Sequence, residues 1–270
     1  MNSTISIVVE TSRLCRHFHR VVLHVPELGE MDLPTAADTS IGIYFDPSAS
    51  LGRTYTVRHC DRSGGLITVD VLLHGEGPGT SWAVGARRGD EVGIAHPGSR
   101  YRERPATDSQ LLVCDMAGLP ALARIIESVP QDADATAVVE VIDESDLDYL
   151  PQRTNVEVVT SVGTGNGVYA TALIDLVTSI RDIARHSYCW FGGEAGSARA
   201  IRKYLRDELH WERGQFDALG YWRLNSEEWD RRYAAIGSRL FTAYQTALAE
   251  GMDERLAAEE YDVALEQAGL

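Results

Sequence analysis

GRTYTVR (residues 52–58) and LITVDVLLHGEGPGTSW (residues 66–82) lie on either side of a short turn sequence, DRSGG. The first segment alternates β-branched, aromatic and charged residues, and the second begins with a nearly continuous apolar run, so both are predicted strands. The glycine-rich HGEGPG predicts a tight turn, and Thr80 or Ser81 predicts the N-cap of a short helix over 82–86. A strand, a glycine turn and a helix N-terminus together predict an anion site, because free backbone N–H groups and the helix dipole face the ligand.

The residue types in these segments suit a flavin dinucleotide. Arg53 offers a guanidinium to a pyrophosphate, Tyr55 offers a flat face to an isoalloxazine ring, and Thr56 offers a hydroxyl and an amide to the ring nitrogens. The candidate cofactor-binding residues here are Arg53, Thr54, Tyr55, Thr56, Val57, Asp70, Val71, Leu72, His74, Gly75, Gly77, Thr80 and Ser81. A plain antiparallel hairpin with a glycine turn is the alternative interpretation of the same pattern.

Three separated motifs resemble the siderophore-interacting protein family. RTYTVR, VDVLLHGEGPGTSWA and RRGDEV resemble its flavin domain, YCWFGGEAGSARAIRKYLR (188–206) resembles its nicotinamide-domain signature, and GYWR (220–223) resembles its closing motif. The resemblance covers roughly residues 5–223. It implies a ferredoxin-reductase-like flavoenzyme that passes electrons from NADH or NADPH through FAD to the iron of a ferric siderophore.

Composition limits the class of protein. The chain has 270 residues, is 44% hydrophobic and 24% charged, and carries a net charge of −15, which disfavours nucleic acid and anionic membranes as partners. No apolar run is long enough to span a membrane, and the N-terminus lacks the pattern of a signal peptide. Cys15, Cys60, Cys114 and Cys189 form no C-x-x-C motif, which disfavours zinc and iron–sulfur sites. We therefore expect a cytoplasmic monomer with no resident metal, no nucleic-acid partner and no membrane insertion.

The pattern of strands and helices predicts two domains. Several short strands with turn signals between them predict a small antiparallel β-barrel, at 5–10, 19–25, 40–45, 53–58, 66–73 and 91–95. From Gln110 onward strands alternate with helices, including a long amphipathic helix over 167–184, which predicts a parallel sheet covered on both faces. With the resemblance, this gives an FAD-binding β-barrel domain at 1–107 and an NAD(P)H-binding α/β domain at 108–270. A helical tail over 226–270 belongs to the second.

The segment between the predicted domains, His96 to Asp108, is irregular and locally basic, and is interpreted as a linker. Its arginines either form a solvated charge run or line a cleft. Three histidines near the N-terminus lie in or beside one predicted strand without a fixed carboxylate nearby. They are interpreted as surface side chains, with a metal site as the alternative: His17, His19 and His24.

Two strand ends are candidates for the nicotinamide site, because ligands of parallel sheets lie beyond the carboxyl ends of the strands. After the fourth sheet strand, Gly193 allows a ligand close to the backbone, and Glu194 and Ala195 open a helix. A capped strand-to-helix turn would explain the same residues. After the first strand, Ala117 stands where the family tends to have a threonine, which argues against efficient nicotinamide use.

Two other segments of the sheet domain bear on the nicotinamide. The acidic IDESD (142–146) follows the second strand and favours the ribose hydroxyls of NADH over a 2′-phosphate. SVGTGNG (161–167) has glycines between a strand and a helix but lacks the acid that follows a dinucleotide-binding fingerprint. It is interpreted as a flexible connection.

The implied substrate, a bulky and often anionic ferric siderophore, requires an open cleft with local cations. Arg223 is the leading substrate-binding candidate because it follows Tyr221 and Trp222 in the closing motif. Further candidates are Lys203, Arg100, Arg102 and Arg206. No side chain is assigned a catalytic or metal-binding role, because the chelator fills the coordination sphere of the iron. A generic flavin reductase, or a flavin- or siderophore-binding protein with weak or lost nicotinamide use, is the alternative function.

Overall fold

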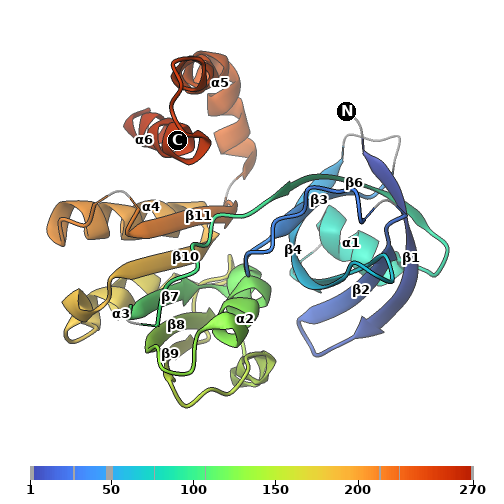
Figure 1. Ribbon diagram of the computed structural model, residues 1–270, viewed down its shortest axis with the longest axis horizontal. Helices are drawn as coiled ribbons and strands as arrows, with labels where there is room; N and C mark the ends of the chain where they lie inside the picture. Colours follow the sequence, from blue (N-terminus) through green and yellow to red (C-terminus); the bar gives the residue numbers. More distant parts are fainter. Residues whose placement is uncertain are drawn as a thin grey trace. The chain divides into compact units, whose positions relative to one another are not determined.

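The computed structural model describes residues 3–26, 28–46, 51–75, 77–106, 108–212, 214–224 and 226–268 (Figure 1). By its internal contacts the chain divides into two units, Met1–Trp222 and Arg223–Leu270. The first unit contains a barrel and a sheet, and the second contains two helices. The boundary predicted between residues 107 and 108 falls between the last barrel strand and the first sheet strand, and remains a prediction.

The N-terminal part of the first unit is a closed antiparallel barrel with the strand order β1-β2-β5-β4-β3-β6. Its strands are β1 (Thr4–Arg13), β2 (Phe18–His24), β3 (Ser40–Tyr44), β4 (Gly52–Asp61), β5 (Leu66–Leu72) and β6 (Glu91–Gly98). Aliphatic side chains such as Val21, Ile41 and Val69 fill the interior. Helix α1 (Pro78–Gly85) places Ala83 in the same core and contacts β2 and β5. The predicted barrel is therefore confirmed.

Two predictions about the barrel are wrong in detail. Helix α1 begins at Pro78, four residues before the predicted start, because proline is favoured in the first helical turn, where no backbone donor is needed. Its N-cap is Gly77, so Thr80 and Ser81 lie inside the helix and do not cap it. Strand β6 continues through Gly98 past a bulge opposite β3, so the linker begins after Gly98 and not at His96.

The sheet of the first unit is parallel, with the order β11-β10-β7-β8-β9. Its strands are β7 (Gln110–Cys114), β8 (Ala135–Val141), β9 (Val156–Val162), β10 (Tyr188–Glu194) and β11 (Phe216–Trp222). Helix α2 (Leu119–Ser128) packs on one face, where Leu122 meets Ala137 and Val139 in one core. Helices α3 (Leu173–Ser179) and α4 (Ala195–Lys203) pack on the other face with Val138. The predicted parallel sheet with both faces covered is confirmed.

The long helix predicted over 167–184 is wrong. Only α3 forms a regular helix there, followed by a short 3-10 turn, η3 (Ile183–Arg185). The backbone is left-handed at Gly167 and again at Asp182, which interrupts a helix at both places. Between them, the Glu140 carboxylate accepts the backbone N–H of Ala172 at 2.6 Å and fixes the start of α3.

The second unit pairs helix α5 (Ser226–Ala249) with helix α6 (Glu254–Gln267), which confirms the predicted helical tail. The two helices meet through aromatic side chains. The Tyr233 and Tyr261 hydroxyls are 2.6 Å apart, and the Phe241 ring meets Tyr261 edge to face. In the part of the chain that the structure describes, no helix has both the length and the apolar character needed to cross a membrane.

Charged side chains connect the barrel to the sheet within the first unit. Arg20 on β2 donates two hydrogen bonds of 2.8 Å to the Asp70 carboxylate on β5, and the Tyr149 hydroxyl from the 3-10 segment η2 (Glu144–Tyr149) donates to the same carboxylate. Arg58 on β4 makes a bidentate pair with Glu127 on α2. These contacts hold the carboxyl ends of the sheet strands beside one side of the barrel.

Candidate functional site

The β4 motif and the first turn of α1 come together at one end of the barrel. Tyr55 is half-buried and its ring centroid lies 5.9 Å from that of Trp82 on α1. A side chain at Gly79 would clash with the Tyr55 hydroxyl, so a glycine is required there. Phe45 stacks on Trp82 at 5.1 Å from the other side. The two sequence motifs that predicted a flavin site therefore form one structural cluster.

The surroundings of α1 fit a pyrophosphate. The N-cap, Gly77, offers no side-chain acceptor to the helix, so the N–H groups of the first turn face outward. Gly75 has a left-handed backbone, and a Cβ added there would meet nothing within 4 Å. Arg53 is exposed, and its guanidinium donates to the neighbouring Gly52 carbonyl at 2.7 Å. The Thr80 hydroxyl stabilises the turn by bonding the backbone of His74.

The other predicted flavin residues divide into two groups. Thr54, His74 and Ser81 are exposed near the cluster. Val57 and Val71 pack into the barrel core and Leu72 packs against the core of the sheet domain, so these three would reach a cofactor through their backbone. The Asp70 side chain is not part of the cluster, because Arg20 and Tyr149 bind its carboxylate.

A single buried carboxylate joins three strand ends in the sheet. Asp115, directly after β7, accepts the N–H of Ala117 at 2.9 Å, the N–H of Glu194 at 2.8 Å and the indole N–H of Trp222 at 2.6 Å. Its exposed fraction is 1%. A Cβ at Gly193 would lie 2.7 Å from this carboxylate. The glycine predicted to admit a ligand is therefore also required by the protein's own packing.

Ala117 and the start of α4 surround this carboxylate. Within the segment 114–120 only Ala117 is partly exposed, which suits the prediction that a nicotinamide lies over it. Glu194 is the N-cap of α4, and its carboxylate accepts the Ser197 N–H at 2.9 Å. Ala195, the first helical residue, is buried. The predicted residues of both strand ends are thus brought together.

The loop after β9 is not the loose connection that the sequence predicted. Its glycines and Asn166 adopt left-handed backbone conformations. The Asn166 side chain accepts the Met116 N–H at 2.9 Å and donates to the Thr164 carbonyl at 3.0 Å. The loop therefore holds the segment next to Asp115 from the opposite side.

Burial raises the pKa of Asp115 to about 6, and this effect outweighs the hydrogen bonds that favour its ionised form. A carboxyl whose pKa is raised on folding stabilises the fold most at low pH, and this contribution is lost as the pH rises through about 6. At each pH, the unfolding free energy of Asp115→Asn is compared with that of the native protein. We expect this difference to shift in favour of the variant by about 2 kcal/mol from pH 4.5 to pH 7. Urea unfolding of both proteins at the two pH values tests this. A difference that does not change with pH would show that Asp115 does not titrate in this range.

The flavin motif and the sheet ends meet at Thr56. Thr56 is buried at the end of the RTYT sequence, close enough to Tyr221 at the end of β11 to affect the pKa of the Tyr221 hydroxyl, although burial dominates and raises that pKa. The Tyr221 ring meets Trp190 edge to face at 6.3 Å, and the Trp190 indole N–H donates to Asp38 of the barrel at 3.4 Å. Residues predicted for the flavin ring and for the nicotinamide domain are therefore neighbours in one unit.

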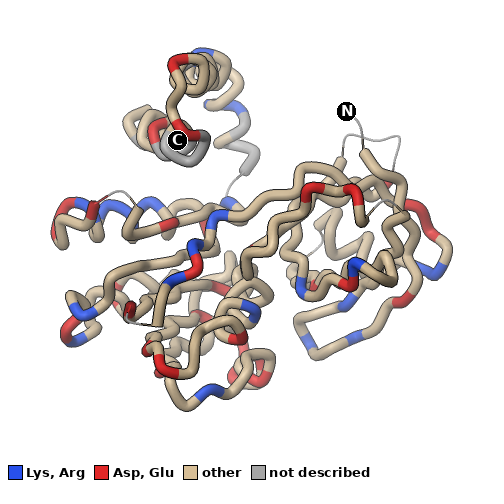
Figure 2. The backbone as a smooth tube through the Cα atoms, in the orientation of Figure 1, with Lys and Arg blue, Asp and Glu red and all other residues tan. Residues whose placement is uncertain are grey.

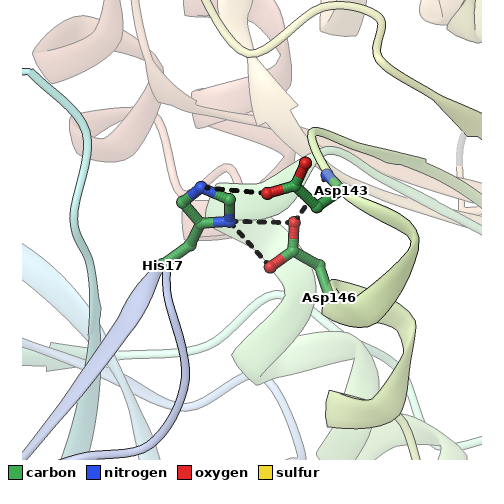
Figure 3. A group of neighbouring side chains, drawn as sticks. All are labelled: His17, Asp143 and Asp146. Carbon is green, nitrogen blue, oxygen red and sulfur yellow. Dashed lines mark hydrogen bonds and ion pairs between the residues drawn. The ribbon is translucent and has the colours of Figure 1, made fainter.

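Two of the three acids at 142–146, Asp143 and Asp146, face His17 of the barrel (Figure 3), whereas the third, Glu144, is exposed. Asp146 is 1% exposed, and both of its oxygens lie within 3.0 Å of His17 Nδ1. Asp143 pairs with Arg16 at 2.8 Å, and one of its oxygens lies 3.7 Å from His17 Nε2. His17 is thus a buried contact between barrel and sheet, and its interpretation as a surface side chain is wrong.

These three side chains have the atoms for a metal site but already bond one another. The carboxylates of Asp143 and Asp146 also form the capping box of η2, in which each accepts an N–H of that turn. We therefore describe the cluster as a hydrogen-bonded contact.

Comparisons with known proteins agree with this geometry. Residues 46–101 match the model of the siderophore-interacting FAD-binding domain, and residues 107–225 match the model of the siderophore-interacting protein. An uncharacterized protein of Mycobacterium tuberculosis is 35% identical over 216 residues, which cover 73% of this chain and 70% of that protein. The chain belongs to the siderophore-interacting protein family.

Members and relatives of the siderophore-interacting protein family extend the comparison. Ferric vibriobactin reductase ViuB of Vibrio cholerae is 29% identical over 180 residues, covering 65% of this chain and 66% of ViuB. A siderophore utilization protein from T. fusca is 28% identical with a TM-score of 0.73, covering 83% of this chain and 94% of that one. A ferredoxin-NADP+ reductase mutant from Plasmodium falciparum, 10% identical, has a TM-score of 0.62 over 82% of this chain and 96% of its own. The resemblance and the ferredoxin-reductase-like fold are confirmed.

The basic residues predicted for the siderophore have different environments. The Arg223 guanidinium lies over the Trp229 ring, with its Cζ 4.1 Å from the ring centroid, inside the second unit. Lys203 is exposed on α4, and Arg100 is half-buried with its backbone N–H bonded to Asp38. Arg206 pairs with Asp207 at 2.8 Å.

Figure 2 shows basic and acidic residues alternating along the linker between β6 and β7. Arg102 pairs with Asp217 on β11 at 3.1 Å, and Arg104 pairs with Asp108. Both arginines therefore fasten the linker, and the solvated charge run is not observed for them.

Sequence reasoning missed Asp115, His17 and the Asp38–Trp190 contact. Asp115 had a usable signal, because a carboxylate directly after a buried strand lies at the ligand edge of a parallel sheet. His17 had none, because its partner Asp146 is 129 residues away in the sequence. The same holds for Asp38 and Trp190, which are 152 residues apart.

Proposed function

We propose that this siderophore-interacting protein is an FAD-dependent ferric-siderophore reductase that takes electrons from NADH or NADPH. The observation that carries the proposal is that the barrel and the sheet end adjoin at Trp190, which meets the Tyr221 ring edge to face and donates to Asp38 of the barrel, with Thr56 near the Tyr221 hydroxyl. This brings Thr56, predicted for the flavin ring, next to Tyr221 of the closing motif, which lies against Gly192, the neighbour of Gly193. A flavin accepts electrons in pairs from a nicotinamide and releases them singly, which reduction of Fe(III) requires.

Each group of residues has a proposed task. Arg53 and the N-terminal turn of α1 hold the pyrophosphate of FAD, and Tyr55 and Thr56 hold the ring. The backbone at Ala117 and Gly193–Ala195 holds the nicotinamide. The chelator keeps its own ligands on the iron, so no side chain needs to bind the metal or move a proton at this step. The match to a relative named ferric vibriobactin reductase supports this substrate class.

Two half-reactions test the proposal separately. The FAD-loaded protein is mixed anaerobically with NADH or NADPH, and flavin bleaching is followed by stopped flow. The reduced protein is then mixed with a ferric chelate, and reoxidation of the flavin is followed. Bleaching without reoxidation would indicate a flavin reductase with another acceptor.

A binding protein with weak nicotinamide use is a second candidate, favoured by one observation. Ala117, partly exposed beside Asp115, lacks the hydroxyl that the family tends to have at this position. Flavin that is not bleached by either nicotinamide, but is reoxidised by ferric chelate after chemical reduction, would select this candidate. The proposal covers both nicotinamides, because two of the three acids of IDESD (142–146), the segment on which the preference for NADH rested, bind Arg16 and His17.

We expect Arg223→Ala to raise KM for an anionic ferric siderophore and to leave flavin reduction by nicotinamide unchanged. Arg223 is half-buried. The physical reason is the loss of a cation from the substrate's approach, so KM of the native protein should also rise with salt. Steady-state kinetics at low and high salt measure both. Arg239→Ala, which removes an exposed arginine from α5 of the same unit, is the matched control. A native KM for Arg223→Ala at low salt would remove this residue from the substrate site.

The location and assembly of the protein remain predictions. All four cysteines are free, as a reducing cytoplasm would leave them. A monomer is expected, and sedimentation of the purified protein measures this directly.

A further inference from the structure

Asp115 lies where three separate parts of the predicted nicotinamide site converge. Its Oδ1 accepts the Ala117 N–H, and its Oδ2 accepts both the Glu194 N–H and the Trp222 indole N–H. The donors lie just after β7 and at the last residues of β10 and β11, three neighbouring strands of the sheet. One carboxylate therefore sets the relative positions of all three strand ends.

The packing around Asp115 leaves it little freedom. It is fully enclosed, and Gly193 has no side chain at the place where the carboxylate lies. On the other side, Asn166 holds the N–H of Met116, the residue between Asp115 and Ala117. The carboxylate and the backbone around it therefore form a rigid block.

We propose that Asp115 is a positioning residue of the nicotinamide site, which holds Ala117, Glu194 and Trp222 in the arrangement that hydride transfer requires. This inference rests on the proposed function, because it assumes that the nicotinamide lies at these strand ends. Asparagine has one acceptor oxygen where the carboxylate has two, and its amide group would face an N–H. Asp115→Asn should therefore release at least one of the three donors.

The kinetic experiment compares half-reactions of the FAD-loaded variants. A misplaced nicotinamide should lower the limiting rate of flavin reduction in Asp115→Asn by about 10- to 100-fold. The bound FAD content, and the rate at which ferric chelate reoxidises chemically reduced protein, should stay native. Trp222→Phe removes only one donor and should have a smaller effect. Because Asp115 and Trp222 share a hydrogen bond, the effects of the two substitutions should not be strictly additive in the double variant.

A second readout does not depend on activity. The near-ultraviolet circular dichroism spectrum of native protein minus that of Trp222→Phe gives the signal of the fixed Trp222 indole. The spectrum of Asp115→Asn minus that of the double variant should give a smaller signal. Asp217→Asn is the matched control, since Asp217 is another buried carboxylate, near the amino end of β11, which binds Tyr188 and Arg102. It should lower stability and keep the native limiting rate.

The outcomes separate this inference from the proposed function. Native protein that no nicotinamide reduces would overturn the proposed function, while the dichroism still tests whether Asp115 holds Trp222. If native protein is reduced and Asp115→Asn is reduced equally fast, the positioning role is wrong and the proposed function stands. Strictly additive effects of Asp115→Asn and Trp222→Phe would also contradict the shared hydrogen bond.

Discussion

Arg53→Ala should purify with little or no yellow colour and should bind added FAD weakly. Arg53 is exposed on β4, two residues before Tyr55, whose hydroxyl lies against Gly79 in the first turn of α1. Without Arg53, backbone N–H groups alone would remain to hold a pyrophosphate. A charge-assisted hydrogen bond contributes about 1.5–3 kcal/mol, so Kd for FAD should rise roughly 10- to 150-fold. Quenching of flavin fluorescence on titration with the apoprotein measures this constant.

The matched control for Arg53 is Arg88→Ala. Arg88 is also an exposed arginine of the barrel part, so this variant makes the same change of net charge away from α1's first turn. It should bind FAD as the native protein does. Equal weakening by both substitutions would mean that the overall field of the barrel, and not a pyrophosphate contact, is responsible. Native affinity in Arg53→Ala would remove Arg53 from the site.

Asp70→Ala should lower the free energy of unfolding by about 3 kcal/mol, and should leave the affinity for FAD close to native. The Asp70 side chain is fully buried, whereas the side chain of its partner Arg20 is 35% exposed. Because solvent can still hydrate the Arg20 guanidinium, the loss of stability is moderated. The substitution leaves the Arg20 guanidinium and the Tyr149 hydroxyl without their acceptor. Urea unfolding followed by tryptophan fluorescence measures the loss.

Two further variants should lower the free energy of unfolding less than Asp70→Ala does. Tyr149→Phe removes one donor and keeps the stacking of its ring on Phe18, so it should cost about 1 kcal/mol. Glu91→Gln neutralises an exposed carboxylate on β6 and should cost almost nothing. If Asp70→Ala loses FAD while keeping native stability, the sequence-based assignment of Asp70 to the cofactor site is right and the structural role is wrong.

The alternation of strands, turns and helices predicted the architecture because these signals are local. The six barrel strands and the parallel sheet follow from periodicity and turn chemistry within short windows. Local signals failed where a distant group decided the outcome. The helix predicted over 167–184 was shortened by left-handed residues and by Glu140, a carboxylate 32 residues from the Ala172 N–H that it accepts.

In the candidate site, too, local sequence signals gave correct predictions, and contacts between distant residues were missed. The clustering of Tyr55 with the first turn of α1 was predictable, because both motifs lie in one stretch of chain. Asp70 was placed with them for the same reason, yet its hydroxyl partner, Tyr149, is 79 residues away on the sheet domain. The acids at 142–146 were assigned to a ribose because nothing in their own sequence indicates His17 and Arg16 of the barrel.

The most direct test of the account is an anaerobic assay with FAD-loaded protein, NADH or NADPH, a ferric siderophore and a chelator that colours only with ferrous iron. We expect ferrous complex to form only when protein, FAD and nicotinamide are all present, in twice the molar amount of nicotinamide oxidised. Nicotinamide oxidation without ferrous complex, or no oxidation at all by flavin-loaded protein, would contradict it.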